Sequence, residues 1–127
     1  MASGVGVSLA APALNSYLGA DANGWSYDSF GNKVTNSGST ALGASYGVGA
    51  VIYVYAEVTA TQTLIWFAKD GVVQGGGDPV AGTSPTFTIA STAVYPAAGL
   101  SGGSVATLLA AATDLPYTPL SGFAPLP

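Results

Sequence analysis

The sequence contains no histidine and no cysteine, and its only basic residues are Lys33 and Lys69. Without histidine the chain has no imidazole base, which excludes a Ser-His-Asp catalytic arrangement. Without cysteine it has neither disulfides nor thiolate metal ligands, and its redox compartment stays undetermined. Two lysines and a net charge of -4 provide no electrostatic surface for a phosphate backbone, so we exclude nucleic acid as a partner.

Charged residues of either sign are scarce. They make up 6% of the chain, against roughly 25% in an average soluble protein, whereas hydrophobic residues make up 49%. The apolar residues are never continuous enough for a membrane-spanning helix, so no membrane span is expected. A surface built mainly from small uncharged residues is poorly protected against association. We therefore expect a subunit of an assembly, either a homo-oligomer or a partner of other protein chains.

Alternating apolar residues predict strands in the first half of the chain. Val5, Val7 and Leu9 alternate with glycine and serine, which is the period-two pattern of a half-buried strand. Residues 51–58 are apolar on both faces for most of their length, as expected of a central sandwich strand. Residues 63–68 form a second strongly apolar strand pattern after a short connection.

The second half of the chain combines turns with shorter strands. The Asp70-Gly71 pair predicts a tight hairpin turn with positive φ. Residues 94–100 and 104–109 are interpreted as a final pair of strands, with a helix in the second segment as the alternative. The proline-rich tail, residues 114–127, is expected to lie extended on the surface.

Together these patterns predict an all-β fold. Short strands separated by glycine-rich turns at regular spacing are typical of an antiparallel β-sandwich. The chain has 127 residues, 18 of them glycine, which suits a single domain covering residues 1–127.

Five segments resemble the SPRY domain, the shared core of the B30.2/SPRY family. Residues 64–72, Leu-Ile-Trp-Phe-Ala-Lys-Asp-Gly-Val, resemble its central hairpin, and residues 94–100 resemble its later Tyr-Pro strand. The remaining segments are residues 25–33, 46–52 and 117–123, the last resembling SPRY-like proteins of bacteriophages and bacteria. The resemblance covers about residues 5–123. It implies a concanavalin-like jelly roll that serves as a recognition module.

The chain departs from the family pattern at its start. It begins at the segment that resembles the family's Gly-Val-Gly strand, so we expect the first sheet to lack the family's preceding strands. A missing neighbour would leave unpaired backbone groups beside Val5, Val7 and Leu9. The prediction is that a neighbouring chain adds a strand at this open edge.

Aromatic residues are the candidate binding residues: Trp25, Tyr27, Phe30, Tyr46 and Trp66. Aromatic rings could form a stacking platform for a ligand or a partner, with core packing as the alternative. Trp66 and Phe67 are neighbours on one predicted strand and must face opposite ways. One of them is then expected in the core, and the other facing outward or toward a partner.

These observations predict a non-enzymatic structural and interaction protein that acts within an assembly. The resemblance implies a bacteriophage virion component, such as a capsid decoration or a tail-associated protein. The alternative is a receptor- or glycan-binding module that uses the loops at residues 20–35 and 74–86. No catalytic residue, metal site or cofactor is expected, because no carboxylate pair, nucleophile with a base, or metal-ligand spacing stands out.

Overall fold

The computed structural model describes residues 3–10, 16–109 and 111–125. The strands are β1 (Gly4–Ser8), β2 (Gly24–Asp28), β3 (Asn32–Thr35), β4 (Gly38–Ala41), β5 (Ile52–Val58), β6 (Thr63–Lys69), β7 (Val72–Val73), β8 (Phe87–Ile89) and β9 (Tyr95–Gly99). A short 3₁₀ helix, η1 (Ala112–Asp114), is the one helical element of the described residues. All pairings between these strands are antiparallel, so the predicted all-β antiparallel fold is confirmed.

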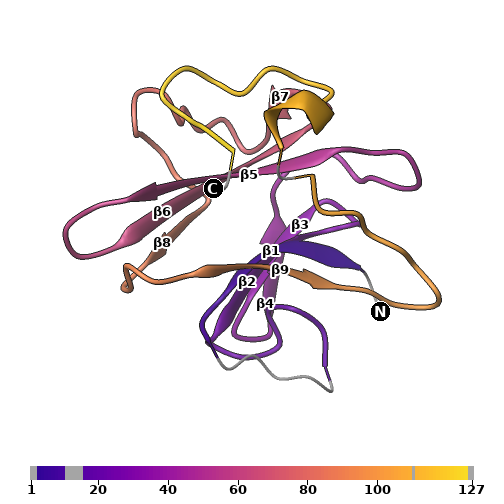
Figure 1. The fold of residues 1–127 in the computed structure, drawn as a ribbon. Coiled ribbons are helices and arrows are strands. Elements are labelled where there is room, and N and C mark those ends of the chain that lie inside the picture. The colour runs from indigo at the N-terminus through magenta and orange to yellow at the C-terminus, as the bar shows by residue number, and fades with distance from the viewer. Residues whose placement is uncertain (1–2, 11–15, 110, 126–127) are drawn as a thin grey trace.

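The strands form two sheets that face each other. A five-stranded sheet has the order β4-β3-β2-β1-β9, and a four-stranded sheet contains β5, β6, β7 and β8, with β8 paired to β6. The main hydrophobic core lies between them, with Val7 and Tyr27 from the first sheet and Ile65, Phe67 and Phe87 from the second. This arrangement is a β-sandwich, and Figure 1 shows its two layers crossing.

Side-chain alternation assigns the residues of each strand to a face. In β2, Trp25 and Tyr27 point into the core, so Ser26 and Asp28 lie on the outer face of the five-stranded sheet. In β3, Val34 belongs to the same outer face, because it lies opposite Ser26 in the register. Around β2 and β3, the outer face therefore combines the polar side chains of Ser26 and Asp28 with Val34.

Strand β1 lies inside the five-stranded sheet, between β2 and β9. Val5 lies opposite Ala98 of β9, and every residue of β1 has a partner on both sides. The Leu9 N–H continues the ladder by donating to the Asn23 carbonyl at 2.9 Å. The prediction of an open edge at Val5, Val7 and Leu9 is therefore wrong. Strand β9 of the same chain occupies the position that was expected to be open.

The predicted last hairpin is also wrong. Residues 104–109 form neither a strand nor a helix, although the preceding Gly102 and Gly103 form a turn with φ of 58° and 78°. Strand β9 pairs with β1 instead. A two-residue period indicates which face of a strand is buried, but it does not indicate which strand lies beside it. In the folded chain, β9 pairs with β1 at five positions.

Strand β5 is an edge strand rather than a central one, so the predicted position of residues 51–58 is wrong. Strand β6 is central, with β5 on one side and β7 and β8 on the other. Both faces of β5 are nevertheless covered over residues 52–55, whereas residues 56–58 are exposed. Val54 packs against the main core, and Tyr55 belongs to a second cluster on the outer face of the sheet. The apolar pattern thus predicted two covered faces correctly for residues 52–55 but not for residues 56–58.

The C-terminal segment covers the outer face of the four-stranded sheet (Figure 1). Leu120 and Phe123 pack against the cluster of Tyr55, Trp66 and Ala68. The rings of Phe123 and Tyr55 are 4.9 Å apart and nearly perpendicular, at 70°. Beyond η1, residues 115–125 form no helix or strand. The tail bends at residues 116–117 and turns at residues 121–122, and its apolar side chains close a second core.

The hairpin between β6 and β7 has the predicted turn. Asp70 and Gly71 have φ of 49° and 85°, and they lie between the paired residues Lys69 and Val72. Positive φ at both central residues is the requirement of a two-residue hairpin turn, and Asp-Gly meets it at low cost.

Candidate functional site

The five predicted binding aromatics do not form one exposed platform. Tyr27 and Trp66 have no exposed surface, and Trp25 and Tyr46 pack against the main core. The prediction is therefore wrong for Tyr27 and Trp66, because other elements of the same chain cover both rings. Phe30, with 70% of its surface exposed, is the member of the set that a ligand can reach freely.

Tyr27 and Tyr46 fasten the loop between β4 and β5 to the core. The Tyr46 hydroxyl donates to the Tyr27 carbonyl at 2.7 Å, and the Tyr27 hydroxyl donates to the Ala44 carbonyl. The two rings meet edge to face with centroids 5.0 Å apart. Burial first, and then the Asp28 carboxylate, raise the pKa of both phenols above the ordinary value of 10.0. Both hydroxyls are thus protonated structural donors at neutral pH.

Loop 74–86 closes over Trp66 on the outer face of the four-stranded sheet. The Trp66 indole N–H donates to the Thr83 carbonyl at 3.0 Å. Asp78 and Thr83 exchange two backbone hydrogen bonds of 3.0 Å, which hold the two sides of the loop together. A Cβ atom at Gly77 would lie 2.7 Å from the Trp66 ring, so the glycine allows this close approach. The loop therefore serves to bury Trp66.

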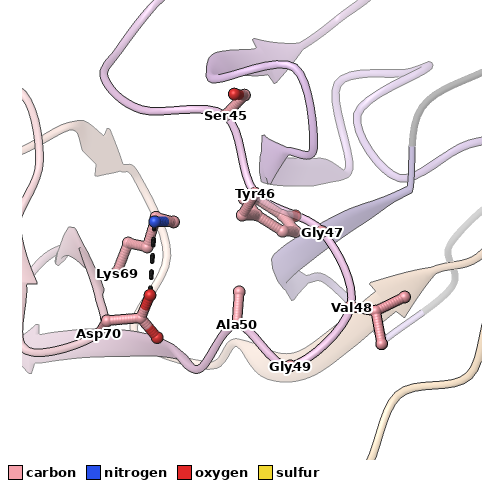
Figure 2. Close-up of a pocket in the computed structure, with 8 residues that line it drawn as sticks. All are labelled: Ser45, Tyr46, Gly47, Val48, Gly49, Ala50, Lys69 and Asp70. Carbon is pink, nitrogen blue, oxygen red and sulfur yellow. Dashed lines mark ion pairs between the residues drawn. The ribbon is translucent and has the colours of Figure 1, made fainter.

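One open pocket of about 440 Å³ lies at the end of the β6–β7 hairpin. Figure 2 shows the Lys69–Asp70 ion pair on one side of this ion-pair pocket and the loop at residues 45–50 on the other. The Lys69 Nζ to Asp70 Oδ2 distance is 3.3 Å, and Asp70 Oδ1 accepts the Val51 N–H at 2.9 Å. That backbone hydrogen bond is the main cause of the lowered pKa of Asp70. The Asp70 carboxylate thus joins the hairpin turn to the residue before β5, and the Lys69 ammonium group is paired with that carboxylate.

A second pocket of about 270 Å³ lies on the outer face of the five-stranded sheet. It is lined by residues of β1 to β4, of the turns that join β2, β3 and β4, and of the segment before β2: Gly4, Tyr17, Leu18, Ser26, Asp28, Phe30, Asn32, Val34, Ser37 and Ser39. We call it the outer-face pocket. Its lining combines two aromatic rings and two aliphatic side chains with hydroxyl, amide and carboxylate groups, and it contains no basic residue.

Asp28 is the charged group of the outer-face pocket, and only 9% of its surface is exposed. Its Oδ1 accepts the backbone N–H groups of Phe30 at 3.0 Å and Asn32 at 2.9 Å. These two bonds fix the carboxylate in one orientation. Among the described residues no buried side-chain oxygen lacks a hydrogen-bond partner. Because Oδ2 has no hydrogen bond to those residues, it is the oxygen that opens to solvent.

Residues 104–109 carry exposed apolar side chains, and we call this segment the apolar arm. Val105 and Leu108 are 88% and 70% exposed, and the segment has no charged residue. Other large apolar side chains, such as Val48 and Val80, are exposed singly. Within the part of the chain that the structure describes, the arm thus gathers three exposed large apolar side chains, Val105, Leu108 and Leu109, in consecutive exposed residues.

Asp28 and the apolar arm were not among the predicted site residues. Alternation along residues 24–28 puts Ser26 and Asp28 on the face opposite Trp25 and Tyr27, and this was the available signal for a polar outer face. Nothing in the sequence indicates that the arm is exposed, because its apolar residues are equally compatible with a paired strand.

Comparison with known proteins identifies no relative: no protein-family model and no curated protein matches this chain. Within the described ranges, no three His, Cys, Asp or Glu residues gather in a group that could hold a metal ion. The same part of the chain has no helix that is both long and apolar enough to span a membrane.

Proposed function

We propose that the protein is a non-enzymatic structural and interaction protein that assembles with other copies of its own chain. The apolar arm is the observation that carries this proposal. Burying an exposed valine or leucine side chain contributes about 1.5–3 kcal/mol, and the arm offers several such side chains in sequence. A partner that covers the arm gains this stabilisation without having to unfold any strand of the sandwich.

The free edge of β5 is the surface that suits the arm best. The Asp70 N–H donates to the Val51 carbonyl and the Thr59 N–H donates to the Gln62 carbonyl, so the odd-numbered residues of this region bond to β6. The N–H and C=O groups of the even-numbered residues of β5 point the other way. No hydrogen bond from a described residue reaches them.

The other sheet edges are less suited to an added strand. Strand β9 contains Pro96, which interrupts a hydrogen-bonded ladder, and β4 has only four residues. Strand β5 has seven residues with no proline and one charged residue, Glu57. The proposed contact is therefore strand addition, in which the arm of one copy pairs with β5 of the next.

Light scattering during size-exclusion chromatography tests the proposal. The natural chain is expected to elute as an oligomer that grows with concentration. A variant with Val105→Asp and Leu108→Asp is expected to elute as a monomer, because charges in the arm prevent its burial. Val80→Asp is the matched control, since Val80 is also exposed but lies outside the arm. A monomer at every concentration, or an unchanged oligomer in the double variant, would contradict the proposal.

The setting we propose is a bacteriophage virion, with the protein as a capsid decoration or a tail-associated component. The resemblance of residues 117–123 to the closing segment of phage SPRY-like proteins supports this setting. Mass spectrometry of purified particles from the source phage tests it. Peptides of this chain are expected in amounts comparable to other structural proteins, and their absence from clean particles would count against a virion role.

A further inference from the structure

We propose that the outer-face pocket binds a neutral monosaccharide unit. This proposal goes beyond the assembly function and is independent of it, because the pocket and the apolar arm share no residue. The pocket lies on the outer face of the five-stranded sheet, whereas the edge proposed for assembly belongs to the four-stranded sheet.

The residues that line the outer-face pocket disfavour an anionic ligand. Asp28 is its charged residue, and no lysine or arginine lines the pocket. A phosphate, a sulfate or a carboxylate would meet an uncompensated negative charge at the Asp28 carboxylate, in a place where that side chain is more than nine-tenths buried. A ligand rich in hydroxyl groups would instead donate hydrogen bonds to Oδ2, and such charge-assisted bonds are the stronger kind.

The protein itself holds the Asp28 carboxylate in a fixed orientation. The N–H groups of Phe30 and Asn32 hold Oδ1 at 3.0 Å and 2.9 Å, so the carboxylate loses little rotational freedom on binding. The side-chain amide of Asn32 and the hydroxyl of Ser39 line the same pocket, and neither makes a hydrogen bond with the described residues. Both groups donate as well as accept, as adjacent hydroxyls of a sugar ring require.

The apolar part of the lining suits the other face of a sugar. A pyranose ring has a face of C–H groups besides its hydroxyl edge. Phe30, with 70% exposure, offers a ring at the pocket, while Leu18 and Val34 provide aliphatic surface. The volume of about 270 Å³ equals about nine water molecules at roughly 30 Å³ each, which is space for one sugar unit rather than a buried oligosaccharide.

Saturation-transfer NMR with four monosaccharides tests the proposal: glucose, galactose, mannose and N-acetylglucosamine. At least one of the four is expected to receive saturation from the natural protein. Asp28→Asn is expected to weaken that binding about tenfold, because its amide oxygen still accepts the two backbone N–H groups while the charged acceptor is lost. Circular dichroism checks that this variant keeps its strands.

Phe30→Ala provides a second variant that does not depend on the folding of Asp28→Asn, since the Phe30 side chain is largely exposed. It is expected to weaken binding about fivefold through loss of the ring. Tyr95→Ala is the matched control, because Tyr95 is also exposed and aromatic but lies outside the pocket. No saturation of any of the four sugars would overturn the proposal. Equal loss of binding in all three variants, or in none, would overturn it too.

A glycan array then distinguishes a sugar at the end of a glycan from a free monosaccharide as the ligand. Binding to immobilised glycans that end in the sugar found by NMR supports recognition of a glycan terminus. Binding of the free sugar alone supports a small-molecule ligand. Failure of the assembly experiment would leave both results standing, since the natural chain and its monomeric arm variant carry the same pocket.

Discussion

Trp66 and Phe67 are adjacent on β6, and both side chains are fully buried, each in a different hydrophobic cluster. Phe67 packs between the two sheets, in a tilted contact with Tyr27 at 5.7 Å. Trp66 lies on the opposite face, under loop 74–86 and the C-terminal tail. The outer layer over Trp66 is therefore a part of the fold, which makes the tail a stabilising element.

The first prediction concerns this outer layer. Phe123→Ala is expected to lower the free energy of unfolding by about 2 kcal/mol, because it removes the ring that contacts Tyr55 at 4.9 Å. Urea unfolding monitored by circular dichroism measures the change. Tyr95→Ala, an exposed aromatic outside both clusters, is expected to change it by no more than about 0.5 kcal/mol. Equal effects of the two substitutions would show that the tail does not stabilise the sandwich.

A second prediction tests the close pairing of β1 with β2. A Cβ atom at Gly6 would lie 1.9 Å from the Trp25 carbonyl oxygen, and Gly6 is paired on both sides. Gly6→Ala is expected to cost about 3 kcal/mol or more, since the backbone of two strands must separate. Gly47→Ala is the control, because no atom lies within 4 Å of its Cβ position. A Gly6→Ala protein as stable as the control would contradict the close approach of the β1 and β2 backbones at Gly6.

The alternation of apolar and polar residues predicts strands and their buried faces, and this limits how much of the fold can be predicted from the sequence. Alternation in residues 5–9 correctly predicts a strand with Val7 in the core, and Asp70-Gly71 correctly predicts the hairpin turn. Alternation does not report which strands are neighbours, so the partner of β9 and the exposure of residues 104–109 could not be derived from it. For the sites, Phe30 was predicted as a binding residue, whereas the role of Asp28 depends on two backbone N–H groups that only the folded turn brings together.

A third prediction follows from the buried phenols. The pKa values of Tyr27, Tyr46 and Tyr55 are raised above 10.0, chiefly by burial. As the pH rises above about 10, the unfolded chain releases these protons first, so the free energy of unfolding must fall. The stabilisation is complete below pH 10 and is lost as the pH approaches the raised values. Urea unfolding at increasing alkaline pH measures this loss.

Tyr46→Phe provides the control for the alkaline experiment, because Tyr46 has a strongly raised pKa and lies against the core. This variant loses the hydrogen bond to the Tyr27 carbonyl and starts from a lower stability. Its stability is nevertheless expected to decline less steeply with pH than that of the natural chain. Parallel declines in the two proteins would mean that Tyr46 does not contribute to the alkaline sensitivity.

Hydrogen–deuterium exchange of the natural protein at high and at low concentration tests assembly through the apolar arm most directly. Exchange at residues 104–109 and along β5 is expected to slow at high concentration, because strand addition would hydrogen-bond the amides of both segments. Peptides from β2 and β6, already paired within the chain, are expected to exchange at the same rate in both samples. Identical exchange of the arm and of β5 at the two concentrations would contradict the account.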